Sequence, residues 1–162
     1  QRYPIFEQGV FQGFLWSQDD ADEFQAEPTG HTVQHKSLIL QGGDQKVASL
    51  QQLVEMSRDM DVLYIPFLHY MNFVNPSKGI VTATSRFGTL LLKADGSVAI
   101  PFNVRVTPSL LDLFGDRIDW LSQSTVVYNT SESYSARNPT AIIVPRFIKT
   151  NGVEISHSNA AF

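Results

Sequence analysis

Histidine side chains are the first groups in this sequence that could act as a base or hold a metal ion. Four are present, at His31, His35, His69 and His157. His31 and His35 lie four residues apart in a segment whose β-branched residues favour a strand, so they would stand about 13 Å apart on one face. A helix would bring the two together, but no neighbouring carboxylate completes a zinc-binding set. We therefore expect solvated strand histidines and no metal site.

An acidic run in the N-terminal part of the chain is the second group that could bind a cation. Ca²⁺ takes several carboxylate oxygens from a flexible loop, but this run lacks the glycine and the spaced bidentate glutamate of an EF-hand. We expect a solvated loop over residues 17–30 and no cofactor, with Ca²⁺ as the weaker alternative. Its ligands would be Asp19, Asp20, Asp22 and Glu23.

Motifs that would identify an enzyme are absent from the sequence. It contains no G-x-S-x-G, H-E-x-x-H, P-loop or G-x-G-x-x-G pattern, and no cysteine. These absences favour a non-enzymatic protein. A hydrolase that combines His35 or His69 with serine and aspartate from elsewhere in the chain stays open as an alternative. His69, with apolar neighbours on both sides, is more typical of a core or interface histidine than of a base.

Composition limits the class of protein further. The 162 residues are 43% hydrophobic and only 17% charged, which indicates one globular domain, or one domain with an arm, and excludes intrinsic disorder. A net charge of −4 disfavours nucleic-acid binding other than non-specific contact. No apolar run reaches the roughly 20 residues that cross a bilayer, so we expect no membrane span. The first residues contain neither an initiator methionine nor a signal-peptide core, which favours a processed chain.

Two helices are predicted. The longer one runs from about 45 to 58, with Asp44 as its N-cap, and it presents one apolar face. A short helix is predicted over 108–114, between Thr107 as cap and Gly115 as terminator. The apolar positions of the longer helix recur at spacings of three and four residues: Val47, Leu50, Leu53 and Val54.

The rest of the chain has the pattern of short strands. Asp95-Gly96 predicts a hairpin between 89–93 and 97–100, because Asp-Gly supplies the positive φ angles of tight turns. Asn151-Gly152 similarly predicts a hairpin between 141–149 and 153–156. Further strands are expected at 10–16, 32–40, 62–70, 80–85, 102–106 and 118–128. The predicted fold is mainly β, an antiparallel β-sandwich of jelly-roll type, with an arm or first strands over 1–44 and the sandwich over 45–162.

The segment from Gly43 to Ser57 resembles the short segment that precedes the first jelly-roll strand in capsid proteins of picorna-like viruses, especially those of insects. The resemblance implies a capsid subunit in a virion, which assembles with copies of itself or with sister capsid proteins and meets a host receptor. The matching positions are Gly43, Asp44, Val47, Ser49, Leu50, Leu53 and Val54.

The leading functional hypothesis is therefore a non-enzymatic virion structural protein. Interfaces are enriched in aromatic residues and methionine, and several such residues fall in predicted loops or at segment ends. A β-sandwich binding module for carbohydrate or a receptor, which would use Trp16, Trp120 and Tyr134, is the alternative. The candidate interface residues are Phe11, Phe14, Trp16, Tyr70, Met71, Phe73, Tyr134 and Phe162.

Overall fold

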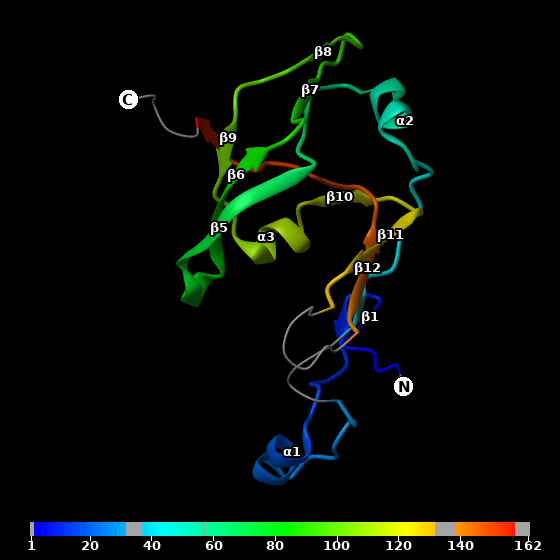
Figure 1. Cartoon of the computed structure of the whole chain (residues 1–162), viewed down its shortest axis with the longest axis vertical. Helices are drawn as coiled ribbons and strands as arrows, with labels where there is room; N and C mark the ends of the chain where they lie inside the picture. The colour runs from blue at the N-terminus through cyan, green and yellow to red at the C-terminus, as the bar shows by residue number, and fades with distance from the viewer. Residues whose placement is uncertain (1, 32–36, 57, 132–138, 158–162) are drawn as a thin grey trace. The chain divides into compact units, whose positions relative to one another are not determined.

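The computed structural model describes residues 2–31, 37–56, 58–131 and 139–157. It is mainly β, with several small sheets and three short α-helices, which confirms the predicted class (Figure 1). Within these ranges no sheet closes into a barrel, and a jelly-roll arrangement is not confirmed. The chain forms two compact units, residues 1–41 with 126–144 and residues 42–125 with 145–162. The predicted division at residue 44 stays a prediction.

The first unit begins with a two-stranded hairpin of β1 (Phe6–Glu7) and β2 (Val10–Phe11). The strand predicted over 10–16 is therefore only two residues long. The unit also contains a three-stranded sheet in the order β11 (Thr125–Asn129), β12 (Ala141–Pro145) and β3 (Leu38–Ile39), in which β3 runs parallel to β12. Most of the strand predicted over 32–40 lies outside the described residues.

Helix α1 (Gln18–Phe24) occupies the acidic run that was predicted to be a loop. Ser17 caps this helix: its Oγ accepts a hydrogen bond from the Asp20 amide at 3.2 Å and donates one to the Asp20 carboxylate at 2.6 Å. Acidic residues in a first turn also interact favourably with the helix dipole. The loop prediction was wrong because this cap stabilises a helix in a segment that lacks apolar periodicity.

The second unit is built on a four-stranded antiparallel sheet. Its order is β14 (Ile155–His157), β9 (Val104–Val106), β6 (Ile80–Arg86) and β5 (Phe67–Asn75). Val81 and Ala83 of β6 are buried on one face, while the alternate residues Thr82 and Arg86 are half-buried on the other. The first face of β6 also contains the buried Ser85, and the second, which we call the polar face, also contains the buried Thr84. The short η1 helix (Pro76–Lys78) joins β5 to β6.

A three-stranded sheet contains the predicted Asp-Gly hairpin, which is confirmed. β7 (Leu90–Leu92) pairs with β8 (Val98–Ala99) on one side and with β4 (Val62–Tyr64) on the other. Gly96 has φ of +86°, as the turn requires. The hydroxyl and the amide of Ser97 both donate to the Asp95 carboxylate and lower the pKa of that group.

Helix α2 (Leu50–Glu55) is shorter than the predicted helix, and its N-cap is Ser49 rather than Asp44. The preceding segment is extended because its backbone pairs with residues 121–123: the Gly43 amide donates to the Ser122 carbonyl at 3.1 Å. A Cβ on Gly43 would lie 2.7 Å from the Leu121 carbonyl oxygen, so this close approach requires glycine. The predicted apolar face is confirmed in part: Val47 and Leu53 pack with Leu92 in the core, although Val47 precedes the helix, whereas Leu50 is 40% exposed.

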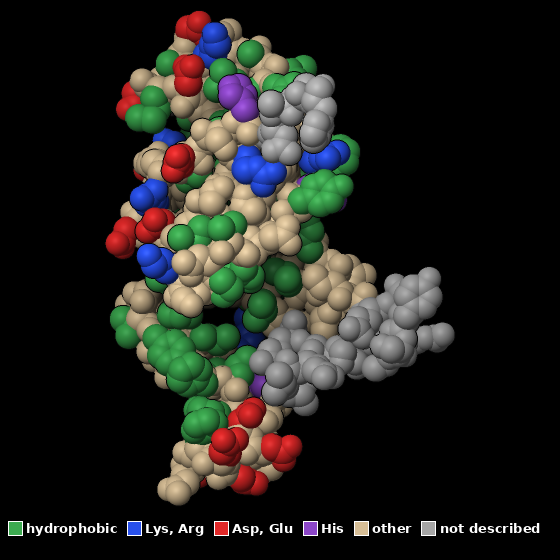
Figure 2. All heavy atoms as spheres, turned by 90° about the vertical axis from the view of Figure 1, so that its left-hand side faces the viewer, with side chains coloured by type: hydrophobic (Ala, Val, Ile, Leu, Met, Phe, Trp, Pro, Cys, Tyr) green, Lys and Arg blue, Asp and Glu red, His purple; other side chains and the backbone are tan. Residues whose placement is uncertain are grey.

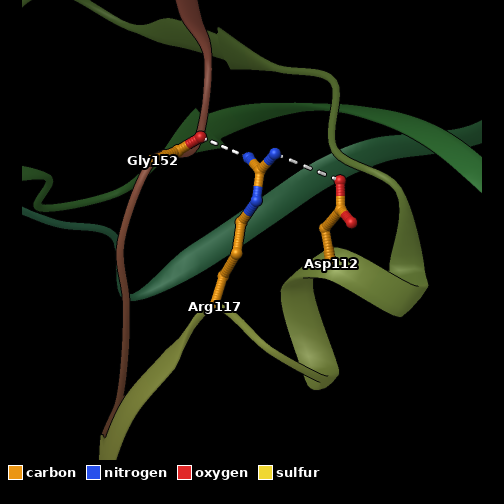
Figure 3. A network of polar contacts seen from close by, with 3 residues as sticks. All are labelled: Asp112, Arg117 and Gly152. Atoms are coloured by element: carbon orange, nitrogen blue, oxygen red, sulfur yellow. Dashed lines mark hydrogen bonds and ion pairs between the residues drawn. The ribbon is translucent and has the colours of Figure 1, made fainter.

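The predicted hairpin around Asn151-Gly152 is wrong. β13 (Ile148–Thr150) pairs with β10 (Ile118–Leu121), and β14 pairs with β9. Arg117 holds the turn in this arrangement: its guanidinium donates to the Gly152 carbonyl and lies 3.4 Å from the Asp112 carboxylate (Figure 3). Asp112 belongs to α3 (Leu110–Phe114), which lies inside the predicted short helix and ends before Gly115 as expected.

Leu92 is completely buried, in contact with α2 and β4 side chains. We expect Leu92→Ala to lower the free energy of unfolding by about 2–5 kcal/mol, because it removes apolar contacts and leaves a cavity. Urea denaturation followed by circular dichroism measures this loss. Leu111→Ala is the matched control: Leu111 is 79% exposed, and its replacement should change stability by less than about 0.5 kcal/mol. Equal losses in both variants would contradict the assigned core.

Ser122 links residues 122–124 with the segment at Phe147 through its buried hydroxyl. Its Oγ accepts from the Phe147 amide at 3.0 Å and donates to the Ser124 carbonyl at 2.8 Å. Ser122→Ala leaves both groups without this partner, so we expect a loss of about 1–3 kcal/mol in the free energy of unfolding. The exposed Ser77→Ala serves as control and should unfold at the wild-type urea midpoint. An unchanged midpoint for Ser122→Ala would refute the role of the hydroxyl.

Candidate functional site

Strand β5 is the longest strand and lies at an edge of its sheet. Among the described residues no strand pairs with its outer side, so this edge is open to an extended chain. Edge strands of soluble proteins are usually short or charged, whereas this one carries large apolar side chains that are 48–63% exposed. They are Phe67, Tyr70, Met71, Phe73 and Val74.

A β-bulge interrupts β5. The register with β6 shifts between His69, which is opposite Thr84, and Asn72, which is opposite Thr82. Tyr70 lies in the bulge with φ of +53°, a conformation that costs free energy for a residue other than glycine. Bulges redirect side chains, and this one places the Tyr70 ring 4.0 Å from the His69 ring and 5.5 Å from the Arg86 guanidinium carbon.

The polar face of the sheet adjoins this bulge. Residues directly opposite each other on paired strands share a face, so Arg86, opposite Phe67, and Arg105, opposite Thr84, lie on the face that carries His69. The Arg105 guanidinium donates to the Thr82 hydroxyl at 3.1 Å. Within the described ranges neither arginine has a carboxylate within ion-pair distance. This face therefore presents two uncompensated positive charges.

Three buried side-chain polar atoms have no hydrogen-bond partner in the described part of the chain: His69 Nδ1, Arg86 Nε and Thr89 Oγ1. A buried donor without a partner costs about 1–3 kcal/mol, so such atoms in a folded protein require an explanation. Two of the three belong to residues on neighbouring positions of β5 and β6. The polar face beside the bulge thus contains two of the three buried polar atoms that lack a partner in the described chain, and a ligand there could satisfy more of these atoms than elsewhere.

A cavity of about 390 Å³ lies elsewhere in the same unit, and both cationic side chains that line it are already bonded. Arg58 donates to the carbonyls of Leu53, Val54 and Lys93, and Lys149 pairs with Asp119 at 2.6 Å. What the cavity offers a ligand is mainly its apolar wall. That wall consists of Leu53, Met56, Val62, Leu92 and Trp120.

The predicted interface residues fall into two groups. Tyr70, Met71 and Phe73 lie on β5, and all three are exposed. Phe11, Phe14 and Trp16 lie in the other unit, where their rings form a row of edge-to-face contacts at 4.9 and 5.5 Å. Tyr134 and Phe162 lie outside the described residues.

The described residues contain no group of three or more His, Asp or Glu side chains that could hold a metal ion. The weak Ca²⁺ alternative placed four carboxylates in one flexible loop, but Asp19, Asp20, Asp22 and Glu23 instead belong to α1. Acidic side chains gather at the lower end of the view in Figure 2. His31 bonds to the Thr29 hydroxyl at 2.9 Å, and His35 lies outside the described ranges. Among the described residues no serine or aspartate forms a hydrogen bond with Nδ1 of His69, the other proposed base.

Arg86 and Arg105 were missed as functional residues by the sequence interpretation, which treated the basic residues as scattered. The available signal was the alternation in β6, where Val81, Ala83 and Ser85 are separated by Thr82 and Thr84. Such alternation predicts a strand with one polar face. Only the pairing with β5 and β9 shows that two arginines and a histidine share that face.

Residues 1–157 match the family model described as the PmbA/TldA metallopeptidase C-terminal domain. No curated protein and no solved structure matches the chain. Within the described ranges no helix is long and apolar enough to cross a membrane.

This match overturns the functional interpretation of the sequence. The resemblance to picorna-like capsid proteins is wrong, and so are the predicted structural role, the sister capsid partners and the location in a virion, because the matching family is one of peptidases. The resemblance rested on a capped amphipathic segment, a pattern that many folds share. The expectation of a non-enzyme without a cofactor is corrected too. The hydrolase alternative was closer, although not through a His/Ser/Asp site.

A metallopeptidase family implies a metal ion, and we tested whether the described side chains fit one. They do not, because zinc sites in peptidases use three protein ligands and the described ranges assemble no such set. The described histidines are His31, His69 and His157. None of them is part of a group of potential ligands.

Proposed function

The chain belongs to the family of PmbA/TldA metallopeptidase C-terminal domains, and from this premise we propose that it serves metal-dependent peptide hydrolysis by binding the peptide substrate along β5. The observation that carries the proposal is the unpaired outer edge of this nine-residue strand within the described chain. An extended peptide can add to such an edge as a further strand through main-chain hydrogen bonds. This mode suits a peptidase because it recognises the backbone of any sequence.

Exposed apolar side chains on β5 support the same role. Met71 and Phe73 are 56% and 60% exposed, and they flank the edge that the peptide would occupy. Burial of such side chains against the peptide would contribute about 25 cal/mol for each Å² removed from water. Main-chain hydrogen bonds then set the register, while these side chains supply affinity.

In this proposal the described residues bind the peptide and provide no metal ligand. Bound metal in a peptidase activates water and polarises the scissile carbonyl. The side chains of β5 and β6 hold and orient the chain to be cut. Formation of homo-oligomers also stays a prediction, and Phe11, Phe14 and Trp16 remain the residues that we propose for contacts between copies.

Lysine substitutions on β5 test the binding edge. We expect Met71→Lys combined with Phe73→Lys to raise the Kd for a labelled apolar peptide at least about tenfold, because two charges must then be buried against the peptide. Fluorescence anisotropy measures the Kd, and circular dichroism verifies the fold. Ile100→Lys, at a loop residue that is 84% exposed, introduces the same charge away from β5 and should bind as the wild type does. Equal affinity of all three proteins would rule out binding at this edge.

A further inference from the structure

The polar face beside the β5 bulge contains two of the three buried polar atoms that lack a partner within the described chain. His69 and Arg86 are diagonal neighbours, since His69 is opposite Thr84 and Phe67 is opposite Arg86. Diagonal residues on paired strands lie within reach of one another when their side chains are long. The two orphaned nitrogens thus belong to one patch of the sheet.

The chemistry of this patch indicates an anionic ligand. Arg86 is always protonated, so its buried Nε can only donate, and within the described ranges nothing accepts from it. Arg105 adds a second guanidinium, fixed by the Thr82 hydroxyl, which in turn bonds to the Thr107 hydroxyl at 3.2 Å. Neither arginine forms an ion pair with a described carboxylate. A carboxylate oxygen matches the planar donors of a guanidinium in geometry and in charge.

Tyr70 connects this patch with the edge of β5. Its ring packs against Arg86 at 5.5 Å, which restricts the guanidinium before any ligand arrives. The same residue stands 63% exposed in the bulge, on the strand that we propose as the peptide-binding edge. The positive φ of Tyr70 costs free energy. A strained bulge at this point is explained if it aligns the patch that contains Arg86 with the edge of β5.

We propose that Arg86 and His69, with Arg105 beside them, form a subsite that binds a carboxylate of the peptide held along β5. The inference rests on the proposed function and adds a substrate preference to it: peptides that carry a carboxylate at this register, from the C-terminus or from an acidic side chain. Main-chain pairing on an edge strand does not distinguish sequences, so the carboxylate subsite sets the selectivity.

Matched peptides separate the two sources of the carboxylate. One pair has the same sequence with a free C-terminal carboxylate or a C-terminal amide, and the other pair has an internal Glu or Gln. We expect the wild type to bind at least one carboxylate peptide about tenfold more tightly than its neutral partner, as loss of a charge-assisted contact implies. Preference within the first pair identifies the C-terminus, and preference within the second identifies a side chain.

Variants at the subsite connect this preference with its residues. In Arg86→Met the Kd values of the carboxylate peptide and its neutral partner should become about equal, while the neutral peptide still binds. Arg86→Lys should restore part of the preference for the carboxylate peptide. Arg146→Met removes an exposed arginine outside this sheet and should keep the full preference. If Arg86→Met fails to fold by circular dichroism, Arg105→Met replaces it, with a smaller reduction expected. A full preference in the folded variant would overturn the assignment.

A titration without peptide distinguishes failure of this inference from failure of the proposed function. Acetate is added to the ¹⁵N-labelled wild-type chain, and the arginine Nε–H resonances are followed by NMR. A saturable shift of the Arg86 resonance, absent in Arg86→Met, supports the subsite even if no peptide binds. Peptide binding without any carboxylate preference, together with no shift, would overturn the subsite and leave the β5 edge intact.

Discussion

Pairing of β5 with β6 is the interaction on which the proposed site depends. The buried residues of β6 fix the apolar face of the four-stranded sheet, and this assigns every alternate residue of β6 to the opposite face. A slip of one residue would move Arg86 into the core, where its guanidinium would cost more than the sheet could offset. The register is therefore strongly specified, and with it the position of His69 relative to the two arginines.

Local signals in the sequence predicted those elements that local chemistry determines. The Asp95-Gly96 turn, the β6 strand and the end of α3 before Gly115 are examples. Gly96 has the positive φ that the turn requires, and β6 follows a run of β-branched and alternating residues. Asn151-Gly152 has an equally strong turn pattern, yet its flanking strands pair with β10 and β9 instead of with each other. A turn signal shows where the chain can reverse, whereas distant partners decide which strands pair.

Tertiary contacts also explain the differences at α2 and at the site. The segment before Ser49 has helical periodicity, but its backbone pairs with residues 121–123, and that pairing competes with the helix. Tyr70, Met71 and Phe73 were predicted as contact residues, because apolar side chains at segment ends are typical of interfaces, and the structure leaves all three exposed. Arg86 was not predictable, since its significance lies in an Nε atom that is buried without a partner in the described chain. That property exists only after folding.

In the proposed arrangement the edge of β5 provides affinity for a peptide, and the arginine beside it provides selectivity. A strand edge binds any extended backbone with similar strength, which suits a protein that must accept many peptides but gives it no means to choose among them. A half-buried arginine beside that edge changes this, because a carboxylate gives its donors a partner that a neutral peptide does not. The Nε donor of Arg86 lacks a partner in the free described chain as well as with a neutral peptide. Specificity of this kind therefore arises from the additional contact with the acidic peptide.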